Sequence, residues 1–301
     1  MRLGHHLQYW GMRLGSALIR WIPLSWVQGL ATGIARALFA LGGKRVRWTL
    51  ANLRIAFPEL SEAEREEIGR QSFVNFALAL LDVLFMDRWT EEELLEHVCI
   101  LGREHLDAAL ARGKGAILLG LHIGSFELGG PAAPALAGTP VAWVSRPIKN
   151  PLVDRRFTDM MTRTGCTLIE PRDAAMRMLR LLRNGGVVGL LNDQYARQTR
   201  GIPVPFFGVR CSTSPGVAIL SLRSGAPVLP TYMTRLGPDR HTATVGPPIE
   251  FESTGDRKRD IELATTAVNR TYEAIIRSNP AQYLWLTRRF RKSPDLPASP
   301  Y

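Results

Sequence analysis

The sequence is poor in cysteine, and it has no acidic residue before Glu59. Its three cysteines, Cys99, Cys166 and Cys211, lie far apart and form no CxxC pair, which argues against a disulfide framework. His, Cys and carboxylate residues show no metal-ligand spacing, so we expect neither a metal nor a bound cofactor. This cysteine usage predicts a reducing, cytosol-facing compartment.

The charge is strongly one-sided, with a net +11 that is concentrated near the N-terminus. Such a field favours an anionic partner: nucleic acid, anionic lipid headgroups or an acidic carrier protein. The basic segment also carries interleaved aromatic residues, namely Trp10, Trp21, Trp26, Phe39 and Trp48. Aromatic side chains beside arginine are typical of a membrane interface, and the sequence has no RRM-type aromatic block, KH loop or zinc knuckle. We therefore predict an anionic membrane surface as partner, and no nucleic acid.

An apolar stretch from Trp21 to Leu41 lies within this segment. Pro23, Gln28 and Arg36 interrupt it, and no small-residue cleavage site of a signal peptide follows. A spanning helix needs about 20 mostly apolar residues, so the stretch is borderline. We predict an embedded or interface-lying anchor over about residues 17–43. A helix packed on a soluble core is the alternative.

Residues 1–88 are predicted to be a helical N-terminal region. Its clearest element is a helix from Glu62 to Met86, because Ser61 and Glu64 form a capping box and apolar residues follow at helical spacing.

From about residue 98, short apolar runs alternate with helical patterns, which predicts an α/β domain over residues 89–292. The predicted strands are Ala116–Leu121, Val141–Ser145, Thr167–Glu170, Val187–Leu191 and Val228–Tyr232. The predicted helices are Pro151–Arg163, Ala174–Arg183, Pro215–Ser224 and Arg259–Ser278. The fold class is a mostly parallel central sheet flanked by helices, with a helical membrane-associating extension. Residues 293–301, rich in Pro and Ser, are predicted to be a loose tail.

A buried-strand pattern runs directly into His122, Ser125 and Glu127. Catalytic residues of open α/β sheets lie at such carboxyl ends of strands. On a continuous helix His122 and Glu127 would point about 140° apart, but a loop-to-helix junction removes that objection. We predict that the Glu127 carboxylate accepts the Nδ1 proton and leaves Nε2 to act as a general base.

Ser125 is a weak candidate for a nucleophile, because no GxSxG elbow surrounds it. A substrate hydroxyl fits better, which predicts transfer without a covalent acyl-enzyme. A structural histidine at a strand end is the alternative.

The His-x4-Glu motif resembles the signature of the glycerolipid acyltransferase superfamily. The chain as a whole resembles the lipid A biosynthesis lauroyl/myristoyl acyltransferase family. The resemblance rests on separated blocks in one order: residues 52–60 (NLRIAFPEL), 122–127, 145–152 (SRPIKNPL), 192–194 (NDQ), 204–208 (VPFFG) and 285–290 (WLTRRF). Thr287 departs from it, since many members carry His at that position.

The resemblance implies substrate-binding residues besides the predicted catalytic pair His122 and Glu127. They are Arg146, Asn150, Asp193, Gln194, Phe206, Arg288 and Arg289. Arg146 is expected to bind substrate phosphate or to stabilise developing negative charge. Asp193 and Gln194 could orient the base or a polar headgroup, or only cap a loop. Phe206 resembles a wall of an acyl-chain channel, although a buried core loop would show the same pattern. Arg288 and Arg289 could meet lipid phosphates or an acidic carrier protein, or form only a solvated face.

The expected function is transfer of an acyl group from acyl-carrier protein or acyl-CoA to a hydroxyl of a lipid A precursor or related glycolipid, for lipopolysaccharide, at the cytoplasmic face of the inner membrane. One alternative is the same chemistry on a phosphatidylinositol mannoside, an ornithine lipid or a lysophospholipid. Another is a non-catalytic lipid-binding protein with the same fold.

Overall fold

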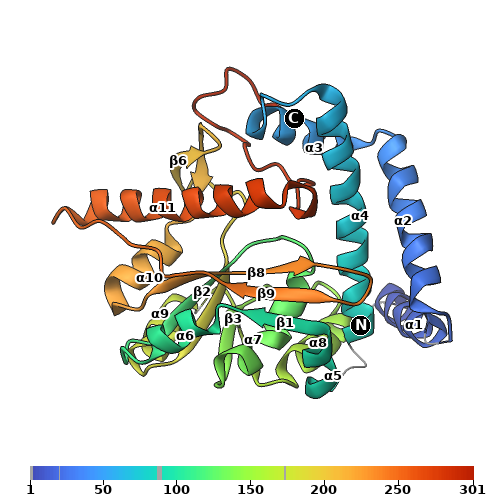
Figure 1. The fold of residues 1–301 in the computed structure, drawn as a ribbon, viewed down its shortest axis with the longest axis horizontal. Coiled ribbons are helices and arrows are strands. Elements are labelled where there is room, and N and C mark those ends of the chain that lie inside the picture. Colours follow the sequence, from blue (N-terminus) through green and yellow to red (C-terminus); the bar gives the residue numbers. More distant parts are fainter. Residues whose placement is uncertain (1–2, 20, 87–89, 173) are drawn as a thin grey trace.

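A seven-stranded sheet organises the computed structural model, which describes residues 3–19, 21–86, 90–172 and 174–301. The strands, shown in Figure 1, are β1 (Val98–Leu101), β2 (Ala116–Gly120), β3 (Val141–Val144), β4 (Cys166–Ile169), β5 (Val187–Leu191), β8 (Val228–Arg235) and β9 (His241–Val245). All five predicted strands are present, with ends that differ by a few residues.

The strand order is β1-β9-β8-β2-β5-β3-β4. The strands from β8 to β4 are parallel to one another, whereas β9 is antiparallel to β8 and parallel to β1. The predicted α/β class with a mostly parallel sheet is confirmed. The edge strand β1 was not predicted, because a run of only four apolar residues does not distinguish a strand from a helix.

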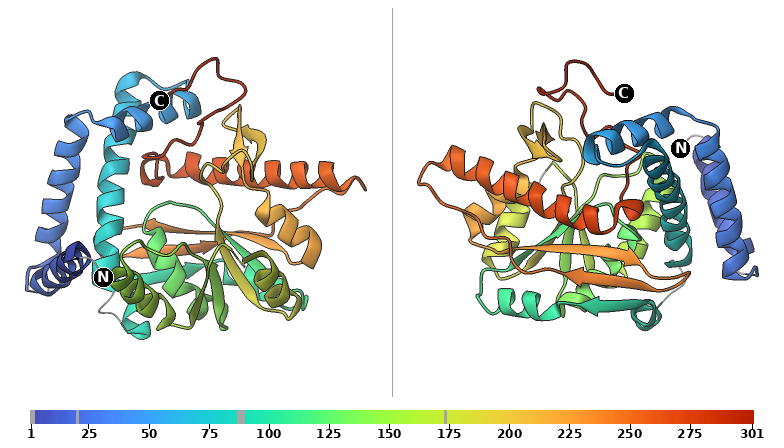
Figure 2. Two further views of the ribbon diagram at one scale, coloured as in Figure 1. Left: turned by 180° about the vertical axis from the view of Figure 1, so that it is seen from behind. Right: turned by 45° about the horizontal axis from the view of Figure 1, so that its top comes forward.

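Helices cover both faces of the sheet (Figures 1 and 2). Ile117 and Leu119 of β2 pack in the core shared with α9 (Ala174–Arg183), α10 (Gly216–Ser224) and α11 (Arg257–Ser278). Ala116 and Leu118 pack in the opposite core, which includes α5 (Glu91–His97), α6 (Arg103–Leu110), α7 (Gly129–Ala137) and α8 (Pro151–Thr162). Because β2 is buried on both faces, its sequence is a continuous apolar run.

The hairpin of β6 (Ile202–Phe206) and β7 (Val209–Thr213) lies beyond α11 (Figure 1). Residues 293–301 form no helix or strand, but they are attached to the domain. Arg210 forms an ion pair with Asp295 at 2.5 Å, and the Tyr301 hydroxyl donates a hydrogen bond to Asn52.

The N-terminal region consists of α1 (Leu3–Ile19), α2 (Leu24–Ala40), α3 (Lys44–Ala56) and α4 (Glu62–Met86). The predicted helix at 62–86 is confirmed, and the predicted boundary at residue 88 lies outside the described residues. Helices α2 and α4 stand side by side at one end of the sheet (Figures 1 and 2). Within the described residues, only Glu62–Phe85 is long and apolar enough to cross a membrane alone, and this helix packs on α2 and α3.

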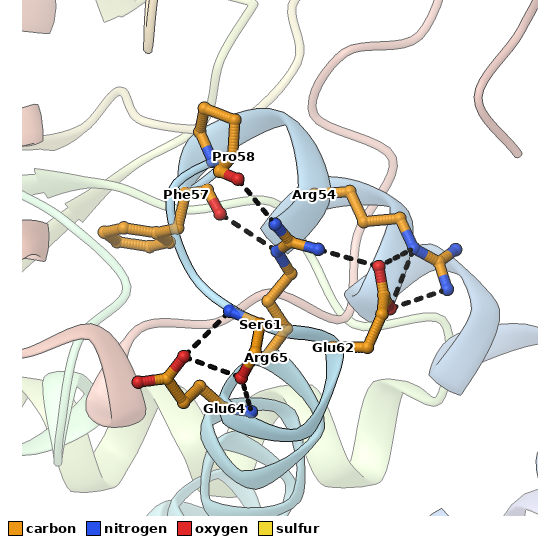
Figure 3. Close-up of polar contacts among 7 residues, drawn as sticks. All are labelled: Arg54, Phe57, Pro58, Ser61, Glu62, Glu64 and Arg65. Carbon is orange, nitrogen blue, oxygen red and sulfur yellow. Dashed lines mark hydrogen bonds and ion pairs between the residues drawn. The ribbon is translucent and has the colours of Figure 1, made fainter.

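The turn between α3 and α4 is fixed by side chains (Figure 3). The predicted capping box is present: the Glu64 carboxylate accepts from the Ser61 amide at 2.8 Å, and the Ser61 hydroxyl accepts from the Glu64 amide at 3.3 Å. The buried Arg65 guanidinium donates to the carbonyl oxygens of Phe57 and Pro58 at 2.9 and 2.8 Å. These bonds satisfy backbone groups at both helix ends, so the angle between α3 and α4 is well determined.

We expect Gly115 to be needed at the start of β2. Its φ is +68°, and a Cβ there would lie 2.3 Å from the Gly186 carbonyl oxygen. Gly113 is a matched control, since its φ is also +68° but nothing lies within 4 Å of the place that a Cβ would take. Gly113→Ala should cost about 1–2 kcal/mol of left-handed strain, and Gly115→Ala clearly more. Thermal unfolding of the purified variants measures the difference, and equal losses would contradict the assigned contact.

Candidate active site

Three predicted site residues follow three parallel strands. His122 follows β2, Asp193 follows β5, and Arg146 follows β3. Strand β5 pairs with both β2 and β3, so the three carboxyl ends lie at one edge of the sheet. This is the edge at which open α/β sheets carry their ligands.

His122 and Asp193 form the closest polar contact at this edge. The Nδ1 atom of His122 lies 2.7 Å from Oδ1 of Asp193, and the His122 backbone amide donates to Oδ2 at 3.3 Å. Asp193 is fully buried, whereas the His122 side chain is 21% exposed. A carboxylate on Nδ1 fixes the ring so that Nε2 faces outward, and Nε2 has no hydrogen-bond partner among the described residues.

The predicted partner of Nδ1 was Glu127, and the structure corrects this to Asp193. Glu127 does lie in the predicted place, the first turn after the loop, which is a short 3-10 helix η1 (Phe126–Leu128). That turn does not bring its carboxylate into hydrogen-bonding contact with the ring. Glu127 remains close enough for its negative charge to act on His122.

The three ionisable groups perturb one another. Burial lowers the pKa of His122, but the charge and hydrogen bond of Asp193, with help from Glu127, outweigh burial and raise that pKa above its ordinary value. Burial raises the pKa of Asp193, yet the His122 charge and several hydrogen bonds hold it below its ordinary value. Burial also raises the pKa of Glu127, with His122 opposing. The Asp193 carboxylate therefore stabilises the imidazolium form of His122, and the His122 ring stabilises the ionised form of Asp193.

Backbone hydrogen bonds to the segment that follows α11 hold the loop that carries His122. The His122 carbonyl accepts from the Leu284 amide at 3.0 Å, and the Gly124 amide donates to the Gln282 carbonyl at 3.0 Å. Ser125 is fully buried, and its hydroxyl accepts from the Arg235 guanidinium at 3.0 Å. Arg235 is also paired with the buried Asp82 of α4. Ser125 thus belongs to a buried network and is not presented to a substrate.

An apolar cavity of about 30 Å³ lies beside His122. The ring of Phe126 links the two, since it lines the cavity and its centroid is 4.9 Å from that of His122. The other walls come from α7 and from the strands β2, β3, β5, β8 and β9, and they include Ala132, Ala133, Leu136, Trp143 and Met233. Small residues on α7 leave this space between the helix and the sheet.

Arg146 and Asn150 follow β3 but have different surroundings. Arg146 is exposed and forms no hydrogen bond or ion pair with the residues that the structure describes. Asn150 is buried, caps α8 by accepting from the Leu152 amide at 3.1 Å, and donates to the His5 carbonyl of α1 at 2.9 Å. Its amide is therefore engaged within the fold, and its role as a substrate ligand stays a prediction.

Phe206 and Arg289 are core residues. Phe206 is fully buried against Phe207 and Phe290, and its role as a channel wall stays a prediction. Arg289 is 1% exposed, and its guanidinium lies over the Phe206 ring and donates to the Ser212 carbonyl at 3.0 Å. It cannot reach a lipid phosphate without leaving the core.

Arg288 and Gln194 keep positions compatible with a site. Arg288 is exposed, with its guanidinium 5.0 Å from the Trp48 ring centroid. Gln194 donates to Oδ2 of Asp193 at 3.0 Å. The role of Asp193 was left open by the sequence, although its place just after a buried strand was the signal that could have decided it. Asn52 on α3 and Asp82 on α4 carried no such signal.

A histidine backed by a buried carboxylate, beside an apolar cavity at the carboxyl edge of a parallel sheet, defines an enzyme suited to proton transfer on a substrate with an apolar part. Residues 2–292 match the family described as bacterial lipid A biosynthesis acyltransferase. The chain belongs to this family and is an acyltransferase.

Curated relatives from Escherichia coli strain K12 are similar over nearly the whole chain. A lipid A biosynthesis lauroyltransferase is 28% identical over 295 residues, covering 96% of this chain and 94% of that protein. A palmitoleoyltransferase of the same process is 27% identical with the same coverage. A myristoyltransferase is 26% identical, covering 98% of this chain and 91% of that protein.

Asp193→Asn is expected to lower the pKa of His122. Without the carboxylate, burial of the ring dominates, so the pKa should fall from above to below its ordinary value of about 6.5. NMR titration of ¹³C-labelled histidine measures it, with the signal assigned by its loss in His122→Ala. A matched Asp107→Asn change, at an exposed residue of α6, should leave the His122 pKa unchanged. An unchanged His122 pKa in Asp193→Asn would contradict the pairing.

Proposed function

We propose that His122 is the general base of an acyl transfer from a thioester to a lipid hydroxyl, oriented by Asp193. The observation that carries this proposal is the 2.7 Å contact between Nδ1 and the buried Asp193 carboxylate, which leaves Nε2 facing outward beside an apolar cavity.

One base is enough for both proton transfers of this reaction. Nε2 takes the proton of the acceptor hydroxyl as its oxygen attacks the thioester carbonyl carbon. The tetrahedral intermediate then collapses, the C–S bond breaks, and the leaving sulfur takes the proton from the imidazolium. The product is an ester and a free thiol, without a covalent acyl-enzyme. Burial of Ser125 in the network with Arg235 supports the direct route.

The charged residues around His122 have distinct proposed roles. Asp193 stabilises the imidazolium through its hydrogen bond, and Glu127 does so through its charge alone. Arg146 lies two strands away, about 10 Å along the sheet, and is exposed. At that separation it suits a phosphate of the acceptor or the developing oxyanion, both of which an arginine can bind.

The acyl chain is assigned to the apolar cavity between α7 and the sheet. Its closed volume of about 30 Å³ is close to that of one water molecule, so a fatty chain enters only if side chains move apart. Alanines on the cavity side of α7, Ala132 and Ala133, leave room for such movement. Each buried methylene then contributes about 0.8 kcal/mol.

The acceptor is proposed to be a lipid A precursor, because the relatives are named for lauroyl, palmitoleoyl and myristoyl transfer in lipid A biosynthesis. The donor is acyl-carrier protein or acyl-CoA, since both present a thioester. An acceptor of another class, such as a lysophospholipid, is an outcome that the assay below separates.

His122→Ala should lower the rate of acyl transfer by about 10³-fold or more, because general base catalysis and orientation are both lost. Purified enzyme is offered acyl-carrier-protein and CoA thioesters with a total lipid extract, and mass spectrometry identifies the acylated lipid. His105→Ala, at a half-buried histidine of α6 away from this edge of the sheet, is the matched control and should retain the rate. Undiminished transfer by His122→Ala would remove the base from the mechanism.

The outer face of the N-terminal helices supports a membrane-bound enzyme. Trp26, Leu30, Ile34 and Leu38 recur every fourth residue of α2 and are all more than half exposed, at 74%, 67%, 52% and 54%. They form an apolar stripe on the side away from α4. The basic residues Lys44, Arg45 and Arg47 at the start of α3 lie directly after it and are exposed. An apolar stripe bordered by basic residues fits the interface of an anionic membrane. We propose the cytoplasmic face of the inner membrane, with which the free cysteines agree.

Replacing Trp26 and Leu30 together by Ser should weaken binding to vesicles containing phosphatidylglycerol by at least about tenfold, because buried apolar area is lost. Leu236→Ser, which removes a leucine 69% exposed beyond β8, is the control and should bind like the wild type. Vesicle flotation measures bound protein, and added salt should weaken binding of all variants. Equal binding of the double variant and the control would place the membrane contact elsewhere.

A further inference from the structure

The side chain of Gln194 lies between Asp193 and Thr287. Its Nε2 donates to Oδ2 of Asp193 at 3.0 Å, and its Oε1 accepts a hydrogen bond from the Thr287 hydroxyl. Asp193 in turn accepts from His122 through its other oxygen. A continuous chain of hydrogen bonds therefore runs from Thr287 to the imidazole ring.

Thr287 is itself held in place from α3. The Asn52 side-chain amide donates to the carbonyl oxygens of Trp285 and Thr287, at 2.7 and 2.6 Å. Its oxygen accepts from the Tyr301 hydroxyl. The Thr287 backbone is thus fixed by a residue that touches neither His122 nor Asp193 in any described hydrogen bond.

The Asp193 carboxylate decides which way the Gln194 amide points. An amide has one donating and one accepting end, whereas an ionised carboxylate only accepts. With the amide reversed, Oε1 would face the Asp193 carboxylate and repel it. The carboxylate therefore turns Nε2 toward itself, and the hydrogen bond donated by the Thr287 hydroxyl holds Oε1 at the other end of the amide.

We propose that Thr287 and Gln194 are positioning residues that hold Asp193 toward His122 and withdraw part of its negative charge. The proposal rests on the proposed role of His122 as base. Nothing in the site requires Gln194 or Thr287 to touch the substrate. A fully concentrated charge on Asp193 would hold the proton on His122 more tightly, and a protonated ring cannot act as a base.

Other ionisable groups face the pair from neighbouring elements. They are Glu127 on η1, Tyr272 on α11, Tyr283 after η2 (Pro280–Gln282), and the nearby Arg289. Burial raises the pKa of both tyrosines well above the ordinary range, so they stay neutral at physiological pH. We call the chain of hydrogen bonds from Thr287 through Gln194 and Asp193 to His122 the relay. Glu127 and Arg289 are unchanged in the variants below, so a shift in the His122 pKa reports the loss of the relay.

Two variants remove the relay at different points. Gln194→Leu removes the donor to Asp193, so the His122 pKa should rise by about half a unit or more. Thr287→Val keeps the amide but removes the hydrogen bond that holds its oxygen, so a smaller rise is expected. Thr287→Ser retains the hydroxyl and should behave like the wild type. Thr271→Val on α11, a half-buried threonine whose hydroxyl donates to the Ala267 carbonyl at 3.0 Å, is the matched control.

The His122 pKa is read by NMR of ¹³C-labelled histidine in the full-length protein, and the acid limb of acyl transfer is read from its pH profile. Both should move to higher pH by the same amount in Gln194→Leu, with kcat near neutral pH about threefold lower or more and KM little changed. A merely structural role would lower activity without moving either midpoint. If Gln194→Leu does not fold, the comparison of Thr287→Val with Thr287→Ser carries the test.

An unchanged His122 pKa in folded Gln194→Leu and in folded Thr287→Val would overturn the proposal. That failure is distinguishable from failure of the proposed base. His122→Ala with full activity would remove the base but leave the NMR titration as a direct measure of the relay.

Discussion

The hydrogen bond between His122 and the fully buried Asp193 is the interaction on which the arrangement of this edge depends. A buried carboxylate is costly unless donors surround it. The Asp193 carboxylate accepts hydrogen bonds from the His122 ring, the His122 backbone amide and the Gln194 side-chain amide. These donors come from the ends of β2 and β5, so the parallel pairing of the two strands is a condition of the site. The order of the strands in the sheet therefore determines which side chains can meet at the site.

The strands and the edge at which the site lies could be predicted from sequence, because buried parallel strands are continuous apolar runs and their carboxyl ends coincide. The partner of His122 could not. Glu127 is five residues away and Asp193 is 71, and short separation suggested contact. Pairing of β2 with β5 is a long-range choice that no local pattern specifies. Conversely, the capping box of Ser61 and Glu64 is wholly local and was predicted correctly.

The run of charge at Arg288 and Arg289 shows a second limit of sequence patterns. Adjacent arginines suggest one solvated surface, yet Arg288 is exposed and Arg289 is in the core. Burial of Arg289 depends on acceptors in the β6–β7 hairpin, at Ser212 and Thr213, and on the ring of Phe206. Those partners lie far away in the sequence. Phe206 also contacts Phe290, so the segment 204–208 and the segment 285–290 pack on each other.

Hydrogen bonds and packed helices connect α2, which carries the apolar stripe, to His122, the proposed base. The segment after η2 that supports His122 is held by α3 through Asn52 and by α4 through Ser72, which donates to the Tyr283 carbonyl at 2.6 Å. Helix α4 packs on α2, whose opposite side carries the apolar stripe. Hydrogen bonds and packed helices leave no free linker between the stripe and the imidazole. Docking of the stripe on a membrane would therefore fix the height and angle of His122 above the lipid. With His122 as the proposed base, such docking would favour acceptors anchored in the same membrane, because their hydroxyls would arrive already oriented, whereas a soluble acceptor would gain nothing from it.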